Sequence, residues 1–89
     1  GAFVTSNRES GDGRYDIQLK PTKKGLPGIL IELKAEKNCS DEQLKKLSET
    51  ALQQINDKKY ETELTTAGVR TIYKYGVAFS GKKVEVAVG

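Results

Sequence analysis

Three charged residues, Asp16, Glu32 and Lys34, lie within two short segments that are otherwise largely apolar. An acid inside an apolar strand loses hydration energy and therefore needs a compensating partner. Two neighbouring carboxylates can bind Mg²⁺, which leaves its other coordination positions to water and phosphate oxygens. A lysine beside them could contact a phosphate or polarise a water molecule. These residue types therefore suit metal-assisted hydrolysis of a phosphodiester, a reaction that needs no histidine.

The spacing of the two segments predicts that the two acids face each other. If residues 21–27 form a loop and Lys20 pairs with Gly28 in an antiparallel hairpin, Asp16 lies directly opposite Glu32. Directly opposed side chains have Cβ atoms about 5 Å apart, and like charges at that separation are destabilising unless something neutralises them. A divalent cation would neutralise them.

An alternative interpretation needs no metal. Asp16 and Glu32 could be exposed charges on the strands that pair with Arg14 and Lys34, because charged strand faces are common. Spacing alone favours this alternative, since an acid followed two residues later by a lysine is a weak signal.

Length and composition limit the possible functions. Eighty-nine residues suit one domain with a modest core. The chain has 15 Lys and Arg residues against 12 Asp and Glu residues, and this net charge of +3 is compatible with a polyanionic partner without requiring one. Because the sequence has no histidine, Ser-His catalysis, Cys-His catalysis and His-ligated zinc are excluded unless another chain contributes.

Cysteine content and hydropathy bear on the compartment. Cys39 is the only cysteine, so no internal disulfide can form, and a cytoplasmic location is expected. No apolar run approaches the roughly 20 residues that span a bilayer, so we expect no membrane association.

Alternation of apolar and polar residues predicts three strands in the first part of the chain. Residues 2–5 suit a short strand, and residues 6–13 have the composition of a loop. Residues 14–20 alternate with the period of a half-buried strand. The run from Gly28 to Ala35 is apolar on both faces except at Glu32 and Lys34, which suits a central strand covered on each side.

A helix is expected next. Ser40 and Gln43 form a capping-box pattern, so the helix should begin near Asp41. Its apolar stripe fits one straight helix only as far as residue 55, so we expect a break between residues 56 and 59. A second short helix should run over 60–66 and stop at Gly68. The apolar stripe of the first helix consists of Leu44, Leu47, Ala51, Leu52 and Ile55.

Two further strands, over 70–80 and 82–89, should form a hairpin at Ser80 and Gly81. The strand alternation places Tyr73, Tyr75 and Phe79 on one face, where core packing is the favoured role. The element order predicts an α/β (α+β) domain with a mixed sheet and a helix on one face.

Four segments in this order, "GRYDIQLKP", "ILIELKAEK", "ALQQINDKKY" and "YGVAFSGKKVEV", resemble the PD-(D/E)XK nuclease superfamily. The resemblance implies a restriction-endonuclease-like fold that uses Mg²⁺ or Mn²⁺. It implies that Asp16 and Glu32 are metal ligands, that Leu33 is a ligand through its backbone carbonyl, and that Lys34 is the catalytic lysine. Tyr15 departs from the family's pattern, which has a proline before the first acid.

The same resemblance implies that Gln54, on the helix, approaches the active site to position water or phosphate, with Lys58 a weaker candidate. An ordinary glutamine at the rim of the apolar stripe, hydrogen-bonded to backbone, is the competing interpretation. The closest likeness is to the nuclease-like region at the C-terminal end of prokaryotic proteins that also carry an AAA-ATPase-like region. Residues 1–89 would then be a single domain and a fragment of a longer protein. The helix that leads such cores would be missing, and its absence counts against activity of the fragment.

The favoured function is a metal-dependent nuclease, with DNA as the favoured substrate and RNA as the alternative. The alternatives are a catalytically inactive module of the same fold that binds nucleic acid or a protein partner, and a structural piece attached to an ATPase. Lysines 20, 23, 24, 82 and 83 could contact phosphates, although ordinary surface lysines are the more common case for each.

Overall fold

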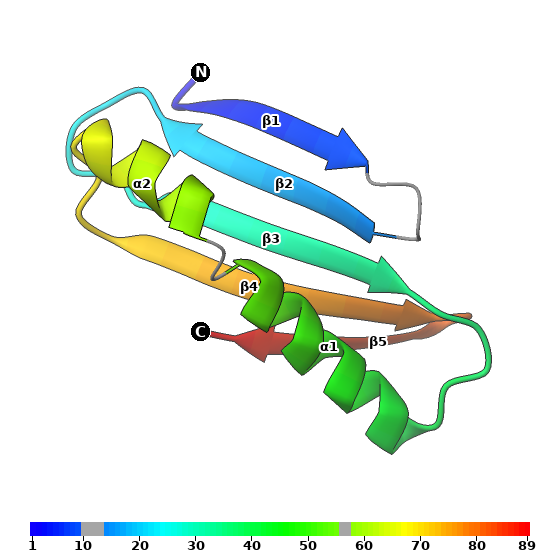
Figure 1. Cartoon of the computed structure of the whole chain (residues 1–89). Helices are drawn as coiled ribbons and strands as arrows, with labels where there is room; N and C mark the ends of the chain where they lie inside the picture. The colour runs from blue at the N-terminus through cyan, green and yellow to red at the C-terminus, as the bar shows by residue number, and fades with distance from the viewer. Residues whose placement is uncertain (10–13, 56–57) are drawn as a thin grey trace.

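The computed structural model describes residues 1–9, 14–55 and 58–89; for residues 8–9 and 58–60 it describes the backbone alone. Five strands form one sheet in the order β1-β2-β3-β4-β5, and two helices lie between β3 and β4 in the chain (Figure 1). The strands are β1 (Phe3–Glu9), β2 (Arg14–Pro21), β3 (Gly28–Ala35), β4 (Ile72–Ser80) and β5 (Lys83–Val88).

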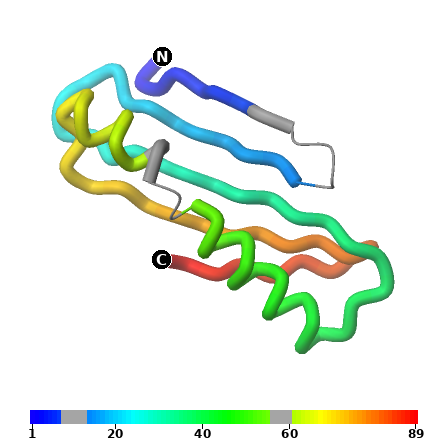
Figure 2. The backbone as a smooth tube through the Cα atoms, in the orientation of Figure 1, coloured from blue at the N-terminus to red at the C-terminus, as the bar shows by residue number. Residues whose placement is uncertain are grey.

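The sheet is mixed. β3 and β4 are parallel, whereas the pairs β1·β2, β2·β3 and β4·β5 are antiparallel. A parallel pair requires a crossover, which the two helices supply. The backbone trace shows both helices on the same side of the sheet (Figure 2). This arrangement confirms the predicted α+β class with a mixed sheet and helices on one face.

Helix α1 (Asp41–Ile55) begins where the capping-box pattern predicts. The N–H of Ser40 donates to Gln43 Oε1 at 2.8 Å, and the N–H of Gln43 donates to Ser40 Oγ at 3.1 Å. These two bonds satisfy backbone donors that the first turn of a helix leaves without partners.

Helix α2 (Lys58–Thr66) begins two residues before the predicted start. The sequence predicts a break between residues 56 and 59; residues 56 and 57 lie outside the described residues, and residues 58 and 59 belong to α2. Its end is set by Gly68, whose φ of 88° few side chains tolerate. The N–H of Gly68 donates to Thr65 at 3.0 Å, and the N–H of Val69 donates to Leu64 at 3.1 Å. This pair of bonds is the Schellman motif, so Gly68 ends the helix as predicted.

The core lies between the helices and the centre of the sheet. Leu30, Ile55 and Leu64 form a buried cluster, and three half-buried residues pack around it: Leu52, Val69 and Ile72. Helix α1 lies directly on β4 at Gly76, where a Cβ would overlap the backbone carbonyl oxygen of Ser48 and the backbone nitrogen of Leu52. Only glycine at this position allows so close an approach.

The other face of the sheet is covered by none of the described residues, so the prediction that β3 is covered on each side is wrong. The prediction of core packing for Tyr73 and Phe79 is also wrong: they are 46% and 41% exposed, although they alternate along one face of β4 as expected. The alternation of Val84, Val86 and Val88 continues this apolar surface across β5, where all three are exposed. We call this surface the open face.

Strand β1 is longer than predicted. It continues to Glu9 and pairs with β2 along its whole length, although residues 6–9 have the composition of a loop. It is an edge strand, and backbone pairing with β2 holds its polar residues in place without any demand for burial.

Candidate functional site

The hairpin of β2 and β3 brings the predicted acids together. Asp16 pairs with Glu32 across the two antiparallel strands, and Arg14 pairs with Lys34. This is the predicted pairing, and it follows from the short loop that joins the strands. Since side chains alternate between the faces of a strand, all four lie on one face. It is the face that carries the helices, because Gly28 and Leu30, also on this side of β3, pack in the core.

Glu32 is buried and paired. The residue is 2% exposed, and its Oε1 accepts hydrogen bonds from Arg14 Nη2 at 2.9 Å and from Arg14 Nε at 3.2 Å. Arg14 reaches this oxygen diagonally, since its directly opposite neighbour is Lys34. The alternative interpretation without a metal predicts that Glu32 is exposed and pairs with a neighbouring cation. The pairing with Arg14 is as that interpretation predicts, but the exposure is wrong, because Glu32 is buried.

Asp16 lies beside Glu32 and is half-buried. Two carboxylates with Cβ atoms about 5 Å apart repel each other unless a cation lies between or beside them. Arg14 provides one such positive charge, on the Glu32 side of the pair.

Lys34 completes the charged group. Partial burial lowers the pKa of Lys34 below its ordinary value of 10.5, the positive charge of Arg14 lowers it further, and Glu36 acts in the opposite direction. A lysine whose charged form is disfavoured gives up a proton more readily than an ordinary surface lysine does. Lys34 lies on the same face as Asp16 and Glu32, where it could hydrogen-bond a water molecule or a phosphate oxygen.

The residues of this hairpin fit a hard divalent cation. Asp16 and Glu32 offer carboxylate oxygens on one face, and Mg²⁺ is commonly held by one or two carboxylates while water and phosphate oxygens fill its other positions. The part of the chain that the structure describes has no cluster of three acids, cysteines or histidines. The side chain of Leu33 lies on the opposite face of β3, so only its backbone carbonyl could contribute a ligand.

Gln54 lies in the last turn of α1 and is half-buried. Its side-chain oxygen Oε1 is buried and finds no hydrogen-bond donor among the described residues. A buried acceptor without a donor is costly, and such groups in native proteins usually have an explanation. Among the described residues, no backbone group donates a hydrogen bond to this oxygen, so the competing interpretation of a rim glutamine bonded to backbone finds no support there. The side chain of Lys58 lies outside the described residues.

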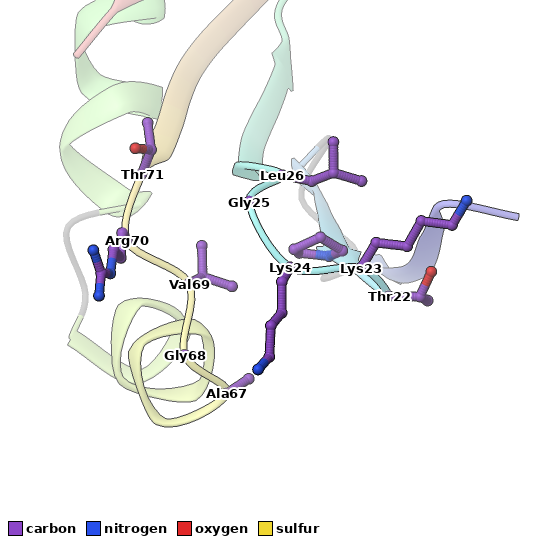
Figure 3. A pocket seen from close by; sticks show the side chains of 11 residues that line it. Thr22, Lys23, Lys24, Gly25, Leu26, Ala67, Gly68, Val69, Arg70 and Thr71 are labelled. Carbon is purple, nitrogen blue, oxygen red and sulfur yellow. The ribbon is translucent and has the colours of Figure 1, made fainter.

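A basic cavity of about 630 Å³ lies at the other end of the β2–β3 hairpin. The loop after β2 and the segment after α2 form its walls, and three cations line it: Lys23, Lys24 and Arg70. Figure 3 shows that these side chains do not converge: Lys24 extends toward Ala67, whereas Lys23 and Arg70 point in other directions. The sequence-based candidates do not include Arg70, because an isolated arginine between a helix and a strand carries no pattern.

The comparison with known proteins identifies one family. A sequence model of the PD-(D/E)XK nuclease superfamily matches residues 1–88, nearly the whole chain. No curated protein and no solved structure matches the chain. Neither α1 nor α2, the helices of the described residues, has the length and apolar character that crossing a membrane would require.

Proposed function

Because the chain belongs to the PD-(D/E)XK nuclease superfamily, we propose that it is a metal-dependent nuclease domain that hydrolyses phosphodiester bonds of DNA rather than RNA. The observation that carries this proposal is the face of the β2–β3 hairpin, where buried Glu32 lies opposite Asp16 and Lys34 follows on the same side. A buried carboxylate beside a second acid is costly to maintain, and a catalytic role would account for it.

Each residue of the hairpin has a separate role in the proposed reaction. Asp16 and Glu32 hold a Mg²⁺ or Mn²⁺ ion, with the backbone carbonyl of Leu33 as a further ligand. When bound, such an ion lowers the pKa of a water molecule and stabilises negative charge on the phosphate. Lys34 hydrogen-bonds the phosphate or the attacking water, and its lowered pKa suits proton movement.

Gln54 positions water in this scheme. Its buried oxygen Oε1 lacks a donor among the described residues, and a water molecule could supply one. Gln54 would then orient a water molecule and leave the handling of its proton to Lys34.

The proposal extends to the surroundings of the domain. We propose a cytoplasmic location, in keeping with the single cysteine. We also propose an AAA-ATPase-like region in the same full-length chain, because the four sequence segments quoted above resemble nuclease-like regions of proteins that carry one. The net charge of +3 is compatible with a nucleic acid as substrate.

Two substitutions separate the roles of lysine and acid when cleavage and metal binding are both measured in the full-length protein. Lys34→Ala should lower metal-dependent cleavage of DNA by about 10²–10⁴-fold while metal binding stays intact, because the lysine contacts phosphate or water. Asp16→Ala should lose both, because it removes a ligand. Lys45→Ala, an exposed lysine on α1, is the matched control and should retain both.

Cleavage that survives Lys34→Ala or Asp16→Ala at the wild-type rate would refute this mechanism. Loss of cleavage in the Lys45→Ala control would show that the assay reports general damage.

A second candidate function is a module that binds nucleic acid without cleaving it. Two observations favour this candidate. Glu32 is already paired with Arg14, and three cations that could contact phosphates line the cavity at the other end of the hairpin. A wild-type protein that binds DNA but cuts none of several substrates with either metal would establish it.

A further inference from the structure

Arg14 holds the buried acid of the candidate site through a single oxygen. Its Nη2 and Nε both donate to Oε1 of Glu32, at 2.9 and 3.2 Å. The two partners differ in exposure: the side chain of Arg14 is 36% exposed, whereas that of Glu32 is 3% exposed. The side chain of Arg14 can therefore rotate away from Glu32 into solvent, whereas the side chain of Glu32 has no such access to solvent.

We propose that Arg14 is a displaceable counter-ion, which neutralises Glu32 while no metal is bound and moves to a phosphate of the substrate once a divalent cation takes its place. The inference rests on the proposed metal-dependent function. A guanidinium group suits this change of partner, because it remains charged and forms paired hydrogen bonds with carboxylates and phosphates alike.

Burial of Glu32 explains why a counter-ion is needed. An ionised carboxylate that is buried without a partner is costly, and Asp16 on the opposite strand increases that cost through repulsion. Lys34 lies on the same face, but the ion pair of Glu32 that the structure shows is with Arg14. Arg14 therefore supplies the positive charge that a divalent cation would supply.

The charges of the hairpin face link the cation to the substrate. At the end of the hairpin that holds the acids, Arg14 and Lys34 carry two positive charges and Asp16 and Glu32 two negative ones, so these four side chains together are neutral without metal. A divalent cation leaves an excess of positive charge, which phosphates of a nucleic acid would neutralise. Release of Arg14 adds a donor for those phosphates, so metal and nucleic acid should strengthen each other's binding.

Metal titration tests the inference directly. Mn²⁺ binding to the wild-type protein and to Arg14→Gln is measured by electron paramagnetic resonance, with Arg70→Gln as the matched control. Arg14→Gln should bind Mn²⁺ about tenfold more tightly, because the competing charge-assisted hydrogen bonds are gone. Mn²⁺ should also raise the melting temperature of this variant more than that of the wild type. Unchanged Mn²⁺ affinity in Arg14→Gln, with equal shifts in melting temperature, would overturn the inference.

A measurement on the wild type does not depend on how the variant folds. The Nε–H signal of Arg14 is followed by NMR during titration with Mg²⁺, and it should move and exchange faster with water as the ion binds. A signal that stays fixed while Mg²⁺ shifts Asp16 and Glu32 would overturn the counter-ion role and leave the proposed function standing. Absence of any metal binding to wild type and variants alike would overturn both.

Discussion

Lys34 is a residue of the candidate site whose pKa is changed by its surroundings in the folded protein. Burial and the nearby Arg14 both disfavour its charged form, and Glu36 favours it. The folded-state pKa therefore lies below 10.5. Between that lower value and 10.5 the unfolded chain binds more protons than the folded protein, so stability from this group rises with pH across the window. Below the window the charge on Lys34 opposes folding.

A titration of lysine side chains by NMR, read at Cε and Hε, checks this shift. The midpoint of Lys34 should lie below 10.5 in the wild type, and Arg14→Gln should raise it because one repulsive charge is gone. A Lys34 midpoint at or above 10.5 in the wild type would contradict the burial that we describe.

At the residue scale, the sequence predicts the pairing of Asp16 with Glu32 because a short loop leaves the hairpin few possible alignments. The sequence does not predict that Arg14 forms its ion pair with Glu32, since the two residues are diagonal neighbours and the contact depends on the length of the arginine side chain. The sequence likewise does not predict that the side-chain oxygen of Gln54 is buried without a donor among the described residues, because this depends on what packs around the end of α1.

At the scale of elements, the contact of α1 with β4 determines where the helix and its Gln54 lie. A Cβ at Gly76 would overlap backbone atoms of Ser48 and Leu52 and would lie 2.9 Å from Leu52 Cα. Backbone atoms cannot turn aside as a side chain can, so the whole helix would have to move.

Gly76→Ala should therefore destabilise the domain by about 1–3 kcal/mol, the usual cost of overpacking, or more. Chemical denaturation measures this change. Gly89→Ala is the matched control, because its Cβ would meet only the side-chain end of Leu52, at 3.0 Å from Cδ1. Equal effects of the two substitutions would show that the close approach of α1 at Gly76 does not limit packing.

Elements with strong local signals are predictable from the sequence. The capping box predicts the start of α1 at Asp41, and Gly68 predicts the end of α2, because both depend on hydrogen bonds within a few residues. β1 is predicted too short because its second half is polar, and an edge strand is stabilised by its neighbour rather than by its own pattern.

At the scale of the whole molecule, the open face of the sheet is the main departure from expectation. Apolar alternation in β4 predicts core packing, but Tyr73 and Phe79 are 46% and 41% exposed. Val86 and Val88 on the neighbouring strand β5 are also exposed, at 48% and 68%. Periodicity identifies which side chains share a face and cannot show whether another layer covers them.

Substitutions on the two faces should therefore differ in cost. Val86→Thr should change the free energy of unfolding by no more than about 0.5 kcal/mol, as expected for an exposed position. Leu64→Ala should cost about 2–5 kcal/mol, since Leu64 is fully buried. Unfolding is measured at two protein concentrations. A large cost for Val86→Thr, or a melting temperature that rises with concentration, would mean that something covers the open face in solution.

Because the sheet is mixed, some residues of the candidate site are positioned by pairing between neighbouring segments of the chain, and Gln54 is positioned by pairing between distant ones. The four charged side chains of the site lie on one hairpin, closed by the short loop between Pro21 and Gly28. Gln54 lies on the crossover between β3 and β4, so its position depends on a pairing that encloses both helices. The entropy lost on closing a chain grows with the length enclosed, and local pairings form more readily than distant ones. The positions of the charged side chains on the hairpin thus depend on contacts between residues close in sequence. The position of Gln54 depends on contacts between residues that are far apart in sequence.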